Sequence, residues 1–312
     1  MNQASTEQSS TGAVQTTGHA WDGDLQEYNN PLPRWWLWSF YATVLFALVY
    51  WVLYPAWPVG TGWTRGVSKV TYEGSDGSDK TVPWNTRSQL LEDMQRSPAA
   101  ERQRSYMDRV AETSYAQILD DPEMLAFAQS VGRGLFGDNC AACHGSGGQG
   151  VLGLFPNLAD DDWLWGGTPE QIHETLVNGR NGYMPGYATV LNDQQLTDVA
   201  TYVLSLSGVA SDSEAVDRGA EIFQGSAGGC WQCHTREGTG LTSLGSANLT
   251  DAIWTIAQVP AADTLEAKIQ EVKEFVGKGV FGTRVMPAWN ERLSPTEIKL
   301  LAVYVHQLGG GE

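Results

Sequence analysis

All four cysteines of this 312-residue chain lie in two pentapeptides that share the pattern Cys-x-x-Cys-His. This spacing allows two thiols to form thioether bonds to the vinyl groups of one haem, and it places the adjacent histidine to bind the iron. A zinc site would need two Cys-x-x-Cys pairs within about twenty residues, whereas these pairs lie 90 residues apart. The motifs therefore predict two covalently bound haem c groups. The predicted attachment and ligand residues are Cys140, Cys143 and His144 in the first motif and Cys230, Cys233 and His234 in the second.

The sequence around the two motifs is duplicated. Gly132-x-x-x-Phe136 precedes the first motif, and Gly219-x-x-x-Phe223 precedes the second. The stretch Leu191–Gly208 matches Leu293–Gly310, and each of these stretches opens with a helix capping box. Two copies of a unit of about 90–100 residues explain this pattern better than a long repeat array. We expect each unit to hold a small helix, the cysteine motif, a loop and a closing helix.

The sixth iron ligand is predicted from the methionines. Of six methionines, only Met184 and Met286 follow a cysteine motif, and each stands before a proline. Proline keeps the preceding residue extended, which suits a loop that presents the thioether sulfur to iron. A core-filling methionine is usually the commoner case, but the repeated context favours ligation here, with His173 as a weaker alternative ligand. The residues leave open whether the two methionines are exchanged between the units.

Histidine and methionine together close both faces of a haem iron. Methionine ligation also raises the reduction potential. Haems ligated in this way pass electrons and do not readily bind oxygen or peroxide. The expected activity is therefore electron transfer.

The order of these features resembles the class I cytochrome c fold, in which the first and last helices of a domain cross beside the haem. In that fold a backbone carbonyl accepts the N–H of the proximal imidazole and so orients the ring. Pro156 in the first unit and Ala247 in the second stand at this position. The helix contacts that the resemblance implies are Gly132 with Tyr202 and Gly219 with Tyr304.

A membrane-spanning helix is predicted near the N-terminus. The run Trp35–Tyr54 has 20 residues and no charge, which gives a helix of roughly 30 Å, the thickness of the hydrocarbon core. Tryptophan and tyrosine cluster at both of its ends, as in the aromatic belts of spanning helices. A cleaved signal peptide does not fit, because an acidic segment precedes the run and no small-residue cleavage site follows it. We expect residues 35–55 to contact membrane lipid.

The flanking basic residues leave the orientation of this helix ambiguous. Covalent haem attachment takes place outside the bacterial cytoplasm, so both haem units are expected in the periplasm. The chain would then be a single-pass protein of the bacterial inner membrane. The expected fold is mainly α. Its expected parts are a cytoplasmic segment 1–34, a transmembrane helix 35–55, a partly helical periplasmic spacer 56–118, and cytochrome c domains 119–209 and 210–312.

The spacer is polar and balanced in charge. Asn85 or Thr86 caps a predicted helix that runs to about Ser97, and Pro98 opens another that runs to Leu119. Such a stretch is either a solvated connection or a helical arm that lies on a partner protein.

The formal net charge of the chain is −17, which argues against nucleic acid as a partner. Residues 120–208 contain eleven acidic and two basic residues, a net −9. The run Asp160–Asp162 is more often a solvated loop than a docking site, but an acidic patch near a haem edge would steer a basic donor cytochrome c.

The segment from Asn30 to Trp38, NPLPRWWLW, enters the span and is more specific than the cysteine motifs. With the spacer and two haem units it resembles the dihaem subunit of cbb3-type cytochrome c oxidases, the CcoP/FixP type. The resemblance implies a non-catalytic subunit that relays electrons from a donor cytochrome c to a separate catalytic subunit, which reduces O2 and pumps protons. A monohaem subunit is a further implied partner. The alternatives are a stand-alone membrane-anchored carrier and a dihaem peroxidase; the peroxidase needs a labile ligand, which the two Met-Pro steps disfavour.

Overall fold

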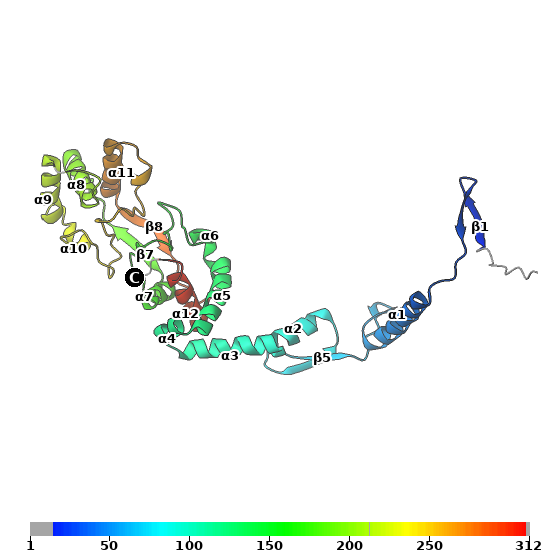
Figure 1. The fold of residues 1–312 in the computed structure, drawn as a ribbon. Helices are drawn as coiled ribbons and strands as arrows, with labels where there is room; N and C mark the ends of the chain where they lie inside the picture. Colours follow the sequence, from blue (N-terminus) through cyan, green and yellow to red (C-terminus); the bar gives the residue numbers. More distant parts are fainter. Residues whose placement is uncertain (1–14, 212, 310–312) are drawn as a thin grey trace, which may run out of the picture. The chain divides into compact units, whose positions relative to one another are not determined.

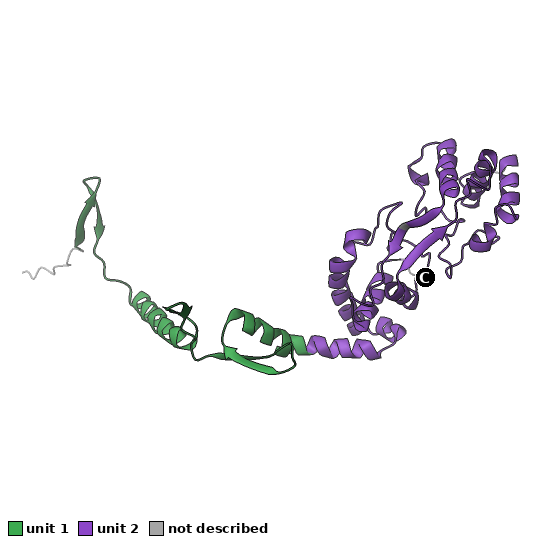
Figure 2. Cartoon of the chain, turned by 180° about the vertical axis from the view of Figure 1, so that it is seen from behind, with its two compact units in different colours: residues 1–101 green, residues 102–312 purple. Residues whose placement is uncertain are grey.

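The computed structural model describes residues 15–211 and 213–309, and the chain divides into two compact units, residues 1–101 and 102–312 (Figure 2). In the first unit, three antiparallel hairpins accompany two helices. The elements of this unit are β1 (Thr16–Trp21), β2 (Leu25–Tyr28), α1 (Arg34–Leu53), β3 (Pro58–Val59), β4 (Gly62–Trp63), β5 (Lys69–Glu73), β6 (Asp79–Pro83) and α2 (Thr86–Arg96).

Helix α1 is the predicted membrane-spanning helix. It has 20 residues, and none of its residues is buried within the structure. Its serine and threonine hydroxyls bond within the helix: Ser39 donates to the carbonyl of Trp35 over 2.9 Å, and Thr43 donates to that of Phe40 over 2.7 Å. A spanning helix must satisfy its polar groups internally in this way, because the hydrocarbon core offers no water. Its length and apolar surface on all sides fit a transmembrane anchor.

The spacer helices follow their caps. The side chain of Asn85 accepts from the amide of Ser88 at the start of α2, as predicted. Helix α3 (Pro98–Glu112) begins at the predicted proline but ends before Leu119. The reason is a capping box in which Ser114 and Gln117 start a new helix, α4 (Tyr115–Asp120). The hairpin β5–β6 was not predicted.

The second unit holds both repeats (Figure 1). In the first repeat the elements are α5 (Pro122–Asn139), α6 (Ala141–His144), α7 (Pro169–Asn178), β7 (Arg180–Met184) and α8 (Asp193–Leu206). In the second repeat they are α9 (Glu214–Gln224), α10 (Trp231–His234), the 3-10 helix η1 (Val259–Ala261), α11 (Leu265–Lys278), β8 (Val280–Met286) and α12 (Pro295–His306). This is the mainly helical, tandem arrangement that the duplication predicts.

The closing helices cross over between the repeats. Helix α8 packs on α9 and α11, and α12 packs on α5 and α7. A Cβ added at Gly132 would lie 2.5 Å from the Cβ of Tyr304, and one added at Gly219 would lie 2.6 Å from that of Tyr202. The expected contacts of Gly132 with Tyr202 and of Gly219 with Tyr304 are therefore wrong. Each glycine faces the tyrosine of the other repeat, because each closing helix lies beside the leading helix of that other repeat.

Strands β7 and β8 are where the chains of the two repeats meet before each closing helix. They pair antiparallel, with Arg180 opposite Met286 and Met184 opposite Val280. Gly279 ends α11 at φ +71°, and a Cβ there would lie 2.5 Å from the carbonyl oxygen of Met184. Glycine is thus required where the second repeat meets the Met-Pro step of the first. The paired strands carry each methionine to the other repeat.

One ion pair with a buried carboxylate distinguishes the two helix crossings. Between α8 and α9, Arg218 Nε donates to Asp198 Oδ2 over 2.8 Å and Nη2 donates to Oδ1 over 2.9 Å. The side chain of Asp198 is only 3% exposed. At the matching positions of the α12–α5 crossing stand Leu300 and Val131, which pack together in an apolar cluster. If each closing helix packed on its own repeat, Asp198 would face Val131 as an unpaired buried charge, which is costly.

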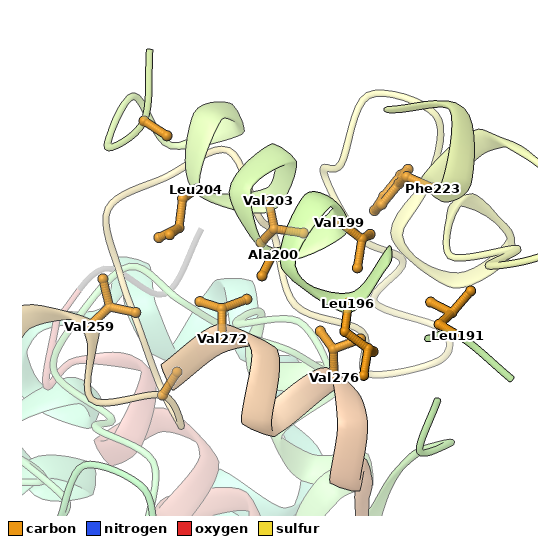
Figure 3. Packing of buried hydrophobic residues seen from close by; sticks show 12 residues of the cluster. Leu191, Leu196, Val199, Ala200, Val203, Leu204, Phe223, Val259, Val272 and Val276 are labelled. Carbon is orange, nitrogen blue, oxygen red and sulfur yellow. The ribbon is translucent and has the colours of Figure 1, made fainter. Parts of the chain in front are cut away.

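The core that α8 of the first repeat forms with α9 and α11 of the second repeat is apolar. Figure 3 shows Leu196 and Ala200 of α8 on the side of the helix that faces Val272 and Val276 of α11. These side chains share one cluster with Phe223 of the leading helix α9. Burial of this cluster joins elements from both repeats, so neither repeat has a complete core of its own.

Candidate haem-binding sites

The second cysteine motif lies in an enclosure with the methionine of the first repeat. Cys230 and His234 line one cavity together with Met184. The rest of the wall is almost wholly apolar and includes Phe223, Leu249, Trp254 and Val272. Helices α8, α9 and α11 and the loop after the motif supply this lining. An apolar enclosure with a histidine and a methionine fits the haem that the motif predicts.

The first cysteine motif, in turn, lies near the methionine of the second repeat. Cys140 belongs to a buried cluster with Trp289 and Tyr304, against which Met286 packs. His144 is buried at the end of α6. Met286, Trp289 and Tyr304 all come from the second repeat. Each methionine thus packs beside the cysteine motif of the other repeat.

The two motif histidines are oriented by backbone carbonyls, as the resemblance implied. His144 Nδ1 lies 3.1 Å from the carbonyl oxygen of Pro156, and His234 Nδ1 lies 2.9 Å from that of Ala247. A carbonyl can only accept, so Nδ1 carries the proton and Nε2 keeps its lone pair for a metal. Burial lowers the pKa of both imidazoles and so favours the neutral form.

The two cysteines of each motif differ in their surroundings. Burial raises the pKa of the Cys140 and Cys230 thiols to about 11 in each case. Cys143 and Cys233 are exposed. In each motif one sulfur thus faces the apolar interior and the other lies at its rim, which suits attachment of one haem edge at two points.

The remaining histidines lie outside these sites. His173 Nδ1 lies 2.7 Å from the hydroxyl of Tyr115, and His306 Nδ1 lies 2.9 Å from the carbonyl oxygen of Gly167. His173 therefore has a side-chain partner in Tyr115. The interpretation of His173 as a weaker ligand candidate has no support in this geometry.

The acidic run is only partly on the surface. Asp161 is exposed, whereas Asp160 and Asp162 are half-buried. Asp160 Oδ1 accepts from the amide of Asp162 over 3.2 Å. Burial, together with the charges of Asp251 and Asp160, raises the pKa of Asp162 to about 6. The run thus folds back on itself, and of its three carboxylates only that of Asp161 belongs to an exposed residue.

Sequence reasoning missed three residues at the sites, Tyr187, Trp289 and Arg284. Tyr187 and Trp289 stand three residues after Met184 and Met286. Each packs against the cluster of the motif that its methionine faces. Their matching offset was a signal available in the sequence. Arg284 has Gly182 at its matching position, so the repeat carried no signal for it.

Comparisons with known proteins agree with these features. Residues 13–61 match the family described as the N-terminal domain of cytochrome oxidase-cbb3, FixP. Residues 128–203 and 214–305 match the family described as cytochrome c oxidase, cbb3-type, subunit III. The chain is 44% identical over 313 residues to the cbb3-type cytochrome c oxidase subunit FixP of Azorhizobium caulinodans, with 96% of this chain and 95% of that protein covered. It is 40% identical over 312 residues to the subunit CcoP of Cereibacter sphaeroides, with 96% and 97% covered.

These matches cover both the spanning segment and the two repeats, over nearly the full length of the relatives. The segment that contains α1 and both repeats thus match parts of one known kind of protein. The chain belongs to the FixP/CcoP family, subunit III of the cbb3-type cytochrome c oxidases.

Proposed function

We propose that this chain is the membrane-anchored, electron-relaying subunit of a cbb3-type oxidase and that it carries two covalent haem c groups. The observation that carries the proposal is that His234 shares a cavity with Met184 of the first repeat, while Met286 of the second repeat packs against the cluster that contains Cys140. Cys140 and Cys143 would hold one haem, with His144 and Met286 as ligands. Each haem would supply a one-electron iron couple that is closed to oxygen on both faces.

The residues of the motifs have defined tasks in this relay. The carbonyls of Pro156 and Ala247 fix the imidazole rings, so that Nε2 of each histidine points into its site. The apolar walls would keep water away from a bound haem and would limit the charge reorganisation that accompanies electron transfer. The two carbonyls would hold the proximal imidazoles in place when the iron changed its charge.

The β7–β8 ladder supports transfer between the two sites. Met184 pairs with Val280 and Met286 pairs with Arg180, so the methionines are separated along the ladder by roughly 13 Å at about 3.3 Å per residue. Both strands lie in one compact unit. Such a fixed, short separation favours direct electron transfer from one haem to the other.

The partners follow from the family and the anchor. We propose the catalytic and monohaem subunits of the oxidase as partners, with α1 packing among their membrane helices. All of its residues are unburied in this chain, which leaves its surface available for lipid and for other subunits. A donor cytochrome c would deliver electrons to the haem domains. Because haem is attached outside the cytoplasm, we place these domains in the periplasm and residues 1–34 in the cytoplasm.

The ligand exchange is tested with single-haem variants of the full-length chain. The variant Cys230→Ala/Cys233→Ala should retain only the first haem. In that background Met286→Ala should abolish the near-infrared sulfur-to-iron band and lower the reduction potential, while Met184→Ala should leave both unchanged. Met124→Ala, which truncates a buried methionine of a different cluster, is the control. Sensitivity to Met184 instead of Met286 would show that each repeat supplies its own ligand.

The assembly is tested by purification from native membranes. We expect this chain to elute with the oxidase subunits rather than alone. A chain that lacks residues 1–58 and carries a cleavable signal should give a soluble protein with two haems. Full oxidase assembly with that truncated chain would contradict the proposed packing of α1 on its partners.

A further inference from the structure

Among the residues that the structure describes, two buried side-chain nitrogens lack a hydrogen-bond partner, Arg284 Nη2 and Trp289 Nε1. Buried donors are nearly always bonded, and an orphaned one is unfavourable, more so when it is charged. Both residues lie within three positions of Met286. Two unpartnered donors on one short segment indicate an acceptor that the polypeptide itself does not supply.

Both donors border the first candidate haem site. Trp289 is 9% exposed and packs in the cluster that contains Cys140 and Tyr304. Arg284 is partly buried and stands two residues before Met286 on β8. Its guanidinium interacts electrostatically with the side chain of His144.

We propose that Arg284 and Trp289 bind the propionate carboxylates of the haem attached at Cys140 and Cys143. This inference rests on the proposed haem attachment. A carboxylate accepts hydrogen bonds only, and it matches the forked donors of a guanidinium as well as an indole N–H. An ordered water could accept from either donor, but it would leave the buried positive charge of Arg284 without an opposite charge nearby other than Asp162.

The second site lacks this cation. At the offset that relates Met184 to Met286, Gly182 takes the place of Arg284 and Tyr187 takes the place of Trp289. Space around Gly182 is open, since a Cβ there would have no neighbour within 4 Å. The two haem sites therefore differ by one buried positive charge, although their ligands have the same types.

This difference sets a direction for the electron. A cation beside a haem stabilises the reduced iron relative to the oxidised iron, which carries one more positive charge. The carboxylate of Asp162 interacts with Arg284 and offsets part of this effect. The net result is a higher potential at the first haem, so that electrons pass from the second haem to the first.

The experiment is a spectroscopic redox titration of the full-length chain in detergent. Haem staining first establishes that both haems are attached, which tests the proposed function separately. Arg284→Gln should shift the equilibrium of the first haem toward its oxidised form by about tenfold, or about 59 mV for a one-electron couple. The second haem should not shift. A variant without Cys140 and Cys143 identifies which redox transition in the titration belongs to the first haem.

Three further variants sharpen the result. Arg284→Lys keeps the charge without the fork and should shift the first haem less than Arg284→Gln. Trp289→Phe should lower the same potential by a smaller amount. Arg292→Gln removes an equal charge from an exposed side chain that stacks on Trp289. It should leave the reduction potentials of both haems unchanged. Two attached haems whose potentials do not respond to Arg284→Gln, or respond equally, would overturn the inference.

Discussion

The exchanged helix packing predicts that two glycines of the same helix respond in opposite ways to alanine. Gly132 and Gly134 both lie within α5. At Gly134 an added Cβ meets no atom within 4 Å, so Gly134→Ala should stabilise the helix by about 0.5–1 kcal/mol. At Gly132 the added Cβ would lie 2.5 Å from the Cβ of Tyr304 and 3.2 Å from the carbonyl oxygen of Leu300.

The magnitude follows from this overlap. The neighbours at Gly132 are a backbone carbonyl and a Cβ of α12, neither of which can rotate away, so α12 must move off α5. Overpacking of this kind costs about 1–3 kcal/mol. After the same gain in helix propensity, Gly132→Ala should destabilise the unit, and the two alanine variants should differ by roughly 1–3 kcal/mol.

The partner of Gly132 is identified by a double-mutant cycle. Tyr304→Gly removes the Cβ that Gly132→Ala would strike, so this pair should couple by about 1 kcal/mol or more. Tyr202→Gly lies at the other crossing and should add independently to Gly132→Ala. Urea unfolding of the full-length protein, followed by circular dichroism, gives the free energies of unfolding. Coupling of Gly132 with Tyr202 but not with Tyr304 would refute the exchanged packing.

Three further outcomes are expected. The hydrogen bonds from Arg218 lower the pKa of Asp198, so the stability that this pair contributes is present above pH 3.8 and is lost as the pH falls through the lowered pKa. Asp198→Asn should therefore reduce the free energy of unfolding at neutral pH. Equal free energies of unfolding for the two proteins would contradict this. The pKa of Asp162 is raised to about 6, so ionisation of this carboxyl lowers the free energy of unfolding as the pH rises from 3.8 to about 6. In a pH series of unfolding curves, Asp162→Asn should remove that decline. A decline of the same size in the variant would show that Asp162 is not its cause. Lys299 Nζ donates to the carbonyls of Val110, Ala111 and Thr113 at the end of α3, over 2.8–3.1 Å. Lys299→Met should lower the free energy of unfolding by about 1 kcal/mol and speed hydrogen exchange at the end of α3. Unchanged exchange would show that these hydrogen bonds are dispensable.

Much of this protein could be read from local sequence. The anchor is determined by 20 uncharged residues, since only a helix satisfies its own backbone in a membrane. Proline and capping residues define where α2, α3 and α12 begin, because these signals act within a few positions of one another. The cysteine motifs and the Met-Pro steps named the candidate haem residues for the same reason: attachment and ligation require fixed residue types at fixed spacing. The carbonyls of Pro156 and Ala247 followed from the resemblance and were confirmed.

The pairing of distant elements was beyond local signals. Both closing helices have the same pattern, and both leading helices offer a glycine to a tyrosine. The resemblance to the class I cytochrome c fold therefore implied a contact of Gly132 with Tyr202. A single side chain distinguishes the alternatives, because Asp198 requires Arg218 where Leu300 requires an apolar neighbour. That preference depends on which two helices are in contact and on how dry the contact is.

What the sequence by itself determined is thus the set of parts: one anchor, two haem motifs, two methionines and their helices. Only the tertiary structure decided that Met184 shares a cavity with His234, that Met286 packs with Cys140, and that Arg284 interacts with His144. The physical reason is range. Capping, backbone conformation and cofactor attachment act over a few residues, whereas burial of an apolar surface or of one charge is settled by whichever distant segment covers it.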